Sequence, residues 1–223
     1  MTLLVVTAVE AEAQAVRAGL RQPVAAASGA EPPQRAPVTV AAAGVGAAAI
    51  AAGTARLLTL AEAAGDPYQA VVLAGIAGGF PGRAPVGATV LAAHSIAADL
   101  GADSPEGFIP LDDLGFGTTI APADPALLAR LRAALPTAIT GDILTVNTVT
   151  GTAQGVQTLA GRFPAAVAEG MEGYGVARAA AAASVPFAEL RTISNAIGPR
   201  DRAAWRIPDA LAALTAAARA LGA

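Results

Sequence analysis

Three polar side chains follow apolar runs in this chain, and their types and positions would suit them to chemistry. Glu12 comes after the run LLVVTAV, Glu172 after AAVAEG, and Asn195 directly after PFAELRTIS. A carboxylate can take a proton from water and so act as a general base. An amide neither gives nor takes a proton near neutral pH, so Asn195 would act by hydrogen bonding.

In open α/β sheets, ligands bind beyond the carboxyl ends of the strands, which is where these three side chains are expected. Each of them also has an ordinary structural explanation. The helix dipole favours glutamate in the first turn of a helix, and asparagine is common in turns and caps. The joint placement of the three favours a functional site over three unrelated caps.

The elements that would position these residues alternate along the chain. Short β-rich runs are followed by longer alanine-rich runs, and the strands are continuously apolar, which is typical of strands covered on both faces. This alternation predicts one α/β layered domain over residues 1–223. We expect helices over about 10–20, from the GVG segment to 64, over 124–134, over 152–161 and from 202 onward, with a long loop near 99–118.

The composition excludes several classes of protein. Of the 223 residues, 54% are hydrophobic and 14% are charged, which predicts a large core, and the net charge of −3 argues against a nucleic-acid partner. There is no cysteine, which excludes disulfides, thiolate metal sites and cysteine nucleophiles. With one histidine, His94, a histidine zinc site or a Ser-His-Asp triad has little support. We expect no metal, and we expect His94 at a strand end or in the core.

Two apolar segments raise the question of a membrane. The start, MTLLVVTAVEAEA, has no basic region before its apolar residues, so it predicts a first strand rather than a signal peptide. The uncharged run 36–55 is long enough for a membrane span but is built mainly of small residues, which favours a strand, a turn and a helix. We therefore expect a cytoplasmic protein without a membrane partner, which also suits the lack of cysteine.

Two glycine-rich segments bear on cofactors. The GVG at 44–46 is incomplete as a dinucleotide motif, because Ala49 stands where a third glycine belongs, and the acidic Glu62 lies in a helix. We therefore expect neither NAD nor FAD, nor any other cofactor. In GIAGGF, residues 75–80, small residues after a strand would let a ligand approach the backbone, although a tight turn explains them equally well.

Four segments carry a resemblance to a known family. TAVEAEA, GIAGGF, EGMEGYGVA and RTISNAIG occur in the order seen in the nucleoside phosphorylase and nucleosidase superfamily, and most resemble its methylthioadenosine/S-adenosylhomocysteine nucleosidase branch. Within that branch, ADLGADSPEGF and ISNAIGPRDRAAW are similar to futalosine hydrolases, which remove hypoxanthine from futalosine in an alternative menaquinone route. The resemblance spans nearly the whole chain. It implies a three-layer αβα domain with a central mixed sheet, a small nucleoside substrate and a homodimer.

The resemblance also implies a role for each matching residue. Glu12 would deprotonate the attacking water. Glu172 would hold the ribose hydroxyls, with Arg191 near the ribose and water. Asn195 replaces an aspartic acid that protonates the purine in adenine-cleaving relatives, so an amide here suits a 6-oxopurine. The other implied substrate contacts are Gly78, Val149, Thr150, Met171 and Ser194.

The sequence departs from the family at two positions. Val149 stands where relatives carry an aromatic ring that stacks on the purine, and Ile76 stands where they often carry a hydroxyl residue. Phe80, Phe108 and Trp205 are the candidate replacements for the ring. The segment 198–206, GPRDRAAWR, is a candidate flap that would cover the base or meet the aromatic carboxylate of the substrate, unless it is the solvated start of the last helix.

The chemistry favours hydrolysis over phosphorolysis. Cleavage of a ribosyl bond passes through an oxocarbenium-like state, which one carboxylate on the ribose diol and another on the water would both stabilise. Phosphorylases of the superfamily need an arginine-rich phosphate cradle with a GDPGR-like turn, but this N-terminus has Glu10 and Glu12, which would repel phosphate. The alternatives are an adenine-specific methylthioadenosine-type nucleosidase, a phosphorylase and a non-catalytic nucleoside-binding protein.

Overall fold

The structure, a computed structural model, describes residues 2–21 and 37–222. Its central element is an eight-stranded mixed sheet in the order β10-β4-β8-β9-β3-β1-β2, in which β7 pairs with β4 and β10 also pairs with β3. The sheet therefore closes into a ring of five strands, with β1 and β2 extending it outward from β3. The strands are β1 (Leu3–Thr7), β2 (Val38–Ala42), β3 (Ala70–Gly79), β4 (Thr89–Ala97), β7 (Ile120–Pro122), β8 (Ile139–Thr145), β9 (Ala166–Gly170) and β10 (Phe187–Ala196).

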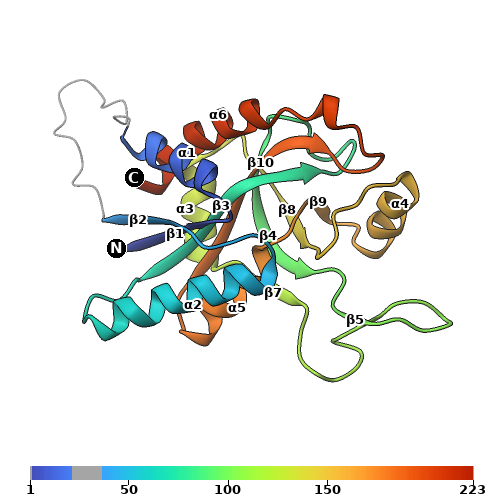
Figure 1. The fold of residues 1–223 in the computed structure, drawn as a ribbon, viewed down its shortest axis with the longest axis horizontal. Coiled ribbons are helices and arrows are strands. Elements are labelled where there is room, and N and C mark those ends of the chain that lie inside the picture. Colours follow the sequence, from blue (N-terminus) through green and yellow to red (C-terminus); the bar gives the residue numbers. More distant parts are fainter. Residues whose placement is uncertain (1, 22–36, 223) are drawn as a thin grey trace.

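Helices cover both faces of the sheet, which confirms the three-layer αβα prediction (Figure 1). One face packs against α1 (Glu10–Arg21), α3 (Pro125–Ala134) and α6 (Ile207–Ala217). The other face packs against α2 (Ala47–Ala63) and α5 (Gly173–Ala182). A further helix, α4 (Ala153–Arg162), packs over the ends of β8 and β9. Because strands such as β1 and β3 are covered on both sides, they are apolar throughout.

Local sequence explains where the helices begin. Asp124 caps α3 by accepting a hydrogen bond from Leu127 N, and Thr152 caps α4 by accepting one from Gly155 N. Before α2, Gly44 (φ 113°) and Gly46 (φ 86°) take backbone conformations that other residues rarely adopt. The segment from β2 to α2 is therefore the predicted strand, turn and helix. In the described parts of the chain, no helix is both long enough and apolar enough to cross a membrane.

The structure differs from the sequence prediction at the C-terminal helix and at His94. A short 3-10 helix (Arg202–Ala204) precedes α6, which begins only at Ile207 because Pro208 is tolerated only in a first helical turn. His94 lies within β4, half-exposed, with its Nδ1 2.7 Å from Asp142 Oδ1, so the prediction of a strand-end or core histidine is wrong.

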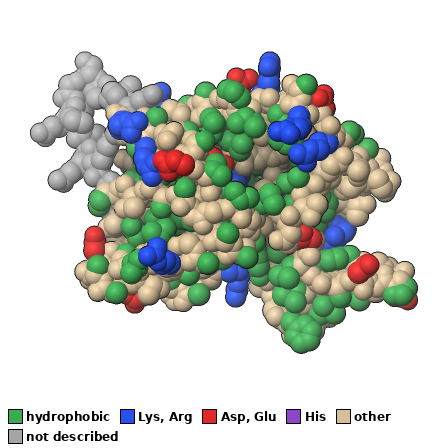
Figure 2. Space-filling view, viewed as in Figure 1, with side chains coloured by type: hydrophobic (Ala, Val, Ile, Leu, Met, Phe, Trp, Pro, Cys, Tyr) green, Lys and Arg blue, Asp and Glu red, His purple; other side chains and the backbone are tan. Residues whose placement is uncertain are grey.

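The predicted loop near 99–118 carries two short paired strands, β5 (Gly101–Ala102) and β6 (Ile109–Pro110). This segment projects from the body of the protein (Figure 1), and hydrophobic side chains gather on it (Figure 2). Phe116 on this segment is 78% exposed, which is unusual for a large aromatic side chain.

Candidate active site

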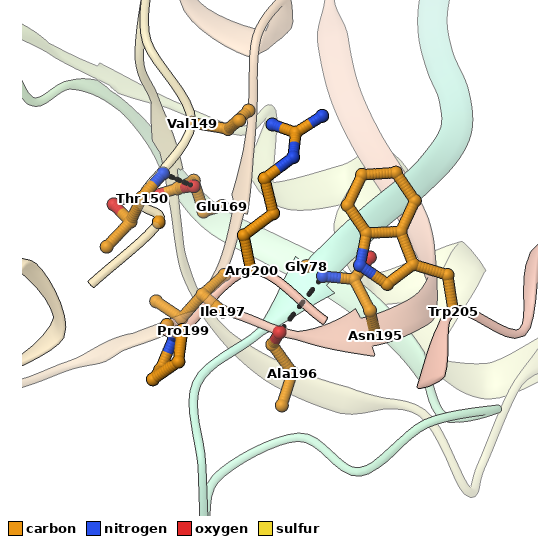
Figure 3. Close-up of a pocket in the computed structure, with 12 residues that line it drawn as sticks. Gly78, Val149, Thr150, Glu169, Asn195, Ala196, Ile197, Pro199, Arg200 and Trp205 are labelled. Carbon is orange, nitrogen blue, oxygen red and sulfur yellow. Dashed lines mark hydrogen bonds between the residues drawn. The ribbon is translucent and has the colours of Figure 1, made fainter. Parts of the chain in front are cut away.

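Three neighbouring strands bring polar side chains together at one edge of the sheet. Gly78 of β3 pairs with Asn195 of β10 on one side and with Glu169 of β9 on the other. Gly78, Asn195 and Glu169 line the same hollow (Figure 3), and Ile197 packs against Gly78 where a side chain would otherwise lie.

Two adjoining hollows occupy this edge, and both are lined by Gly78, Val149, Glu169, Asn195 and Trp205. We call first hollow the one that is also lined by Thr150, Ile197, Gly198, Pro199 and Arg200. We call second hollow the one that is also lined by Glu12, Ile76, Met171, Glu172 and Ser194. Eight of the nine predicted site residues therefore line one or both hollows, and the ninth, Arg191, lies directly behind the second.

Glu12 lies in the first turn of α1 and is only 3% exposed. One carboxylate oxygen accepts hydrogen bonds from Ala8 N (2.9 Å) and Val9 N (3.2 Å), and the other accepts one from Ile76 N (2.8 Å). Three backbone donors thus hold the carboxylate in place where it lines the second hollow. The alternative of an exposed first-turn carboxylate applies instead to Glu10, which pairs with Arg17 on the surface.

Arg191 is 1% exposed and links two buried carboxylates. Its Nη2 donates to Glu172 Oε2 (3.0 Å) and its Nε donates to Glu189 Oε1 (2.8 Å). Burial acts to lower the pKa of Arg191, but the charges of Glu189, Glu172 and Glu12 outweigh it and raise that pKa above its usual value. Arg191 is therefore a permanent cation that holds Glu172 at the second hollow.

Glu172 is buried at the start of α5, and its side chain makes no capping hydrogen bond to that helix. Its carboxylate instead accepts from Gly46 N (3.2 Å) and Met171 N (3.1 Å), besides Arg191. The helix-cap explanation therefore does not hold for Glu172, and its role toward the ribose stays a prediction.

Glu189 was missed by the sequence reasoning, although a glutamate inside the otherwise apolar strand PFAEL is a signal that could have identified it. It is buried, it accepts a hydrogen bond from Ser95 Oγ, and it accepts another from Nε of Arg191, whose Nη2 donates to Glu172. Glu189 therefore fixes the position of the guanidinium.

Glycines make room for this charged cluster. A Cβ at Gly75 would lie 2.7 Å from Glu12 Oε1 and 3.0 Å from Arg191 Nη1. At Gly170 it would lie 3.1 Å from Arg191 Nη2, and at Gly173 it would lie 2.2 Å from Glu189 Oε2. The glycines at 75, 78 and 79 belong to β3, which runs to Gly79, so the tight-turn explanation of GIAGGF is wrong for them.

A β-bulge positions Asn195 and Ser194 together. The pairing of β10 with β3 shifts between Ile193 and Asn195, so that Ser194 is the extra residue. Ser194 Oγ donates to Asn195 Oδ1 (2.8 Å), and Asn195 Nδ2 donates to Ala196 O (3.0 Å; Figure 3). The bulge lets consecutive residues both line the second hollow.

Of the three candidate rings, Trp205 is the one at the site. Phe80 is buried in a core cluster, and Phe108 lies under the guanidinium of Arg162 (4.0 Å to the ring centroid). Trp205 lines both hollows, with Arg200 and Arg202 5.4 and 5.8 Å from its ring centroid.

The candidate flap, 198–206, contributes Gly198, Pro199, Arg200 and Trp205 to the first hollow. Arg206 N at its end donates to Ser194 O (2.8 Å), which ties the segment to β10. The segment thus lies at the first hollow, with Arg200 exposed to solvent. The role of Arg200 and Arg202 in holding the carboxylate of the substrate stays a prediction.

Comparisons with known proteins agree with this architecture. The model of the phosphorylase superfamily matches residues 28–223. A futalosine hydrolase of Streptomyces coelicolor is 55% identical over 174 residues, covering 78% of this chain and 74% of the relative. A futalosine hydrolase of Acidothermus cellulolyticus is 49% identical over 227 residues, covering 99% of this chain and 90% of the relative.

Solved structures are similar at lower identity. A 5′-methylthioadenosine/S-adenosylhomocysteine nucleosidase from Neisseria meningitidis superposes with a TM-score of 0.78 at 20% identity, covering 99% of this chain and 98% of that one. A futalosine hydrolase of Helicobacter pylori superposes with a TM-score of 0.74 at 18% identity, covering 99% and 95%. At these identities the two structures establish the shared fold.

Proposed function

Because this chain belongs to the phosphorylase superfamily and, within it, to the futalosine hydrolases, we propose that it hydrolyses the N-glycosidic bond of futalosine. The products are hypoxanthine and dehypoxanthinylfutalosine, in an alternative route to menaquinone. The observation that supports this most directly is the pair of buried carboxylates, Glu12 and Glu172, at the second hollow.

In this proposal the second hollow holds the ribose and the attacking water. Glu172 accepts hydrogen bonds from the ribose hydroxyls, and its negative charge stabilises the sugar as it becomes cationic. Glu12 orients the water and takes its proton as the new bond forms. Met171 packs against the sugar, and Arg191 keeps Glu172 in place.

The charges around the second hollow favour water over phosphate as the nucleophile. Three carboxylates line it, those of Glu12, Glu169 and Glu172, and among its described lining residues there is no lysine or arginine. A phosphate dianion in this space would meet repulsion, because the cation behind it, Arg191, is already paired with Glu172 and Glu189. This supports hydrolysis against the phosphorylase alternative, while Glu12 has no evident use in a protein that only binds nucleosides.

A direct assay tests the proposed function. The protein is incubated with futalosine, inosine and methylthioadenosine, with and without phosphate, and the released base is quantified. We expect hypoxanthine from futalosine at a rate that does not depend on phosphate. Preferred release of adenine from methylthioadenosine would support the adenine nucleosidase instead, and a requirement for phosphate would support a phosphorylase.

We assign the first hollow and the shared residues to the base, with Val149 and Thr150 flanking it and Asn195 as its hydrogen-bond partner. Hypoxanthine can take part of the negative charge of the departing bond on its carbonyl, so it needs less proton donation than adenine does. An amide can donate to O6 and accept from a protonated N7, whereas a carboxylate facing O6 would repel it.

Asn195→Asp is therefore expected to lower kcat/KM for futalosine and to raise the relative activity on its 6-amino counterpart. The change in the ratio should be about tenfold or more, because a mismatch leaves buried polar groups unpaired. Aspartate can keep the hydrogen bond from Ser194 Oγ but loses the one that Asn195 Nδ2 donates to Ala196 O. The measurement is kcat/KM for both substrates in both proteins, and an unchanged ratio would make Asn195 only a bulge residue.

We also propose that the protein acts as a homodimer in the cytoplasm. Exposed apolar side chains, including Val45 beside the second hollow, Phe116 and Ile120, provide surface that a second copy would cover. The lack of cysteine suits a reducing compartment. Light scattering on the purified protein tests the dimer, which should show twice the mass of one chain.

A further inference from the structure

Glu169 is a buried carboxylate at the site for which the proposed mechanism has no use. It is 3% exposed, lines both hollows, and lies across Gly78 from Asn195. Water-activation belongs to Glu12 and ribose binding to Glu172. Burial of a carboxylate is costly unless hydrogen-bond donors compensate it, and the described donors to Glu169 both come from Thr150.

Glu169 reverses the hydrogen-bonding character of one wall of the first hollow. Thr150 N donates to Glu169 Oε1 (2.7 Å), and Thr150 Oγ1 donates to Glu169 Oε2 (Figure 3). Without this carboxylate, Thr150 would present two donors to the ligand. With it, the wall presents carboxylate oxygens, which accept hydrogen bonds and do not donate them.

The two purine classes differ in what they offer to such a wall. A 6-oxopurine carries a hydrogen on N1 and an acceptor at O6, whereas a 6-aminopurine carries a lone pair on N1 and donors at the 6-position. A carboxylate can accept a hydrogen bond from N1–H of a 6-oxopurine. The lone pair on N1 of a 6-aminopurine would instead repel the carboxylate. The amide of Asn195 supplies the donor that O6 or N7 needs.

We propose that Glu169 accepts the N1–H of the 6-oxopurine base and, together with Asn195, selects such a base against a 6-aminopurine. This inference rests on the proposed nucleosidase function and assigns a second specificity residue to the same site. The two side chains come from β9 and β10, on either side of Gly78, so the gap between them receives the edge of the ring.

The pKa of Glu169 agrees with a carboxylate that can accept one more hydrogen bond when the base is bound. Burial raises the pKa of Glu169 and the nearby charge of Asp99 acts in the same direction, while the hydrogen bonds from Thr150 act to lower it. A donor from the base would add to the hydrogen bonds that favour the ionised form.

Glu169→Gln is the variant that tests this role with little change in shape. The amide oxygen of the new side chain would accept from Thr150 N, and its amide nitrogen would donate to Thr150 Oγ1, which leaves one amide hydrogen facing the hollow. The wall would then present a donor, which suits N1 of a 6-aminopurine. We expect kcat/KM for futalosine to fall about 10- to 100-fold, as for loss of a hydrogen bond to a charged group, and the 6-amino counterpart to lose much less.

A second measurement needs no turnover. Calorimetry compares the binding of hypoxanthine with that of 1-methylhypoxanthine, in which a methyl group replaces the hydrogen on N1. The methyl group should weaken binding to the wild type about 10- to 100-fold and should weaken it less in Glu169→Gln. Glu62→Gln, on the exposed surface of α2, is the control for the charge change and should behave as the wild type does.

The outcomes separate this inference from the proposed function. If futalosine releases no hypoxanthine, the proposed function is wrong, and the binding of the two bases still tests Glu169. If futalosine is hydrolysed but Glu169→Gln leaves both the substrate ratio and the methyl penalty unchanged, Glu169 does not contact N1. Equal binding of the two bases to the wild type overturns the inference by itself.

Discussion

Glu12→Gln is expected to lower kcat for futalosine by about 10²–10⁴-fold, the usual contribution of a general base, with a further loss from disturbed positioning of the water. Glutamine has nearly the same shape but cannot take a proton from water at neutral pH. Its single amide oxygen can also accept from at most two of the three backbone N–H groups that hold Glu12. The amide nitrogen, itself a donor, would face the remaining N–H and could not accept from it. KM should change little, because Glu12 is assigned to the water and not to the nucleoside.

The chain offers a matched control for this variant. Glu10 lies on the same turn of α1, carries the same charge and pairs with Arg17 at the surface. Glu10→Gln should keep the wild-type kcat, and steady-state kinetics with equal amounts of folded protein compare the two. A near-normal kcat in Glu12→Gln would remove the general base from the proposed mechanism.

Glu172→Gln should lower kcat/KM by about 10²-fold or more, the sum of two hydrogen bonds to a charged acceptor. Both KM and kcat should worsen, because the ribose contact exists in the bound substrate and strengthens as the sugar becomes cationic. The variant also leaves Arg191 with one buried carboxylate partner, Glu189, in place of two. More positive charge would then face the oxocarbenium-like state.

Substrates lacking one ribose hydroxyl distinguish this role from a purely structural one. Removal of the 2′- or 3′-hydroxyl should lower kcat/KM strongly in the wild type and less in Glu172→Gln. In the variant, the hydrogen bond between residue 172 and that hydroxyl is already weaker. The measurement is a cycle of kcat/KM values for two substrates and two proteins. An equal loss of kcat/KM in both proteins would mean that Glu172 only stabilises the buried cluster around Arg191 and does not bind the ribose.

The fold and much of the candidate site could be predicted from local patterns. Glu12, Glu172 and Asn195 each follow an apolar run, and the alternation of strands with helices implies that such residues meet at one edge of a sheet. The structure brings them together as expected. What the pattern could not give was the burial of Glu12 against β3, where Ile76 N, far away in the chain, donates to its carboxylate.

A glutamate inside an apolar strand could have marked Glu189 as a candidate, but the roles of Glu169 and Glu189 depend on pairing between distant strands and were not predicted. Glu169 reaches the site because β9 pairs antiparallel with the end of β3, and a single sequence carries no local signal for that pairing. Glu189 meets Ser95 because β10 lies beside β4. The bulge at Ser194 is likewise a property of two strands together.

The three glycines packed against the charged cluster have a consequence for the evolution of the chain. Alanine is abundant here, and a single nucleotide change converts a glycine codon into an alanine codon. Drift should therefore offer alanine repeatedly at Gly75, Gly170 and Gly173, where its methyl group would press on Glu12, Arg191 or Glu189. Purifying selection is then needed to keep these three positions free of the residue that mutation supplies most readily, whereas Gly151 and Gly161, where a methyl group would meet open space, can drift.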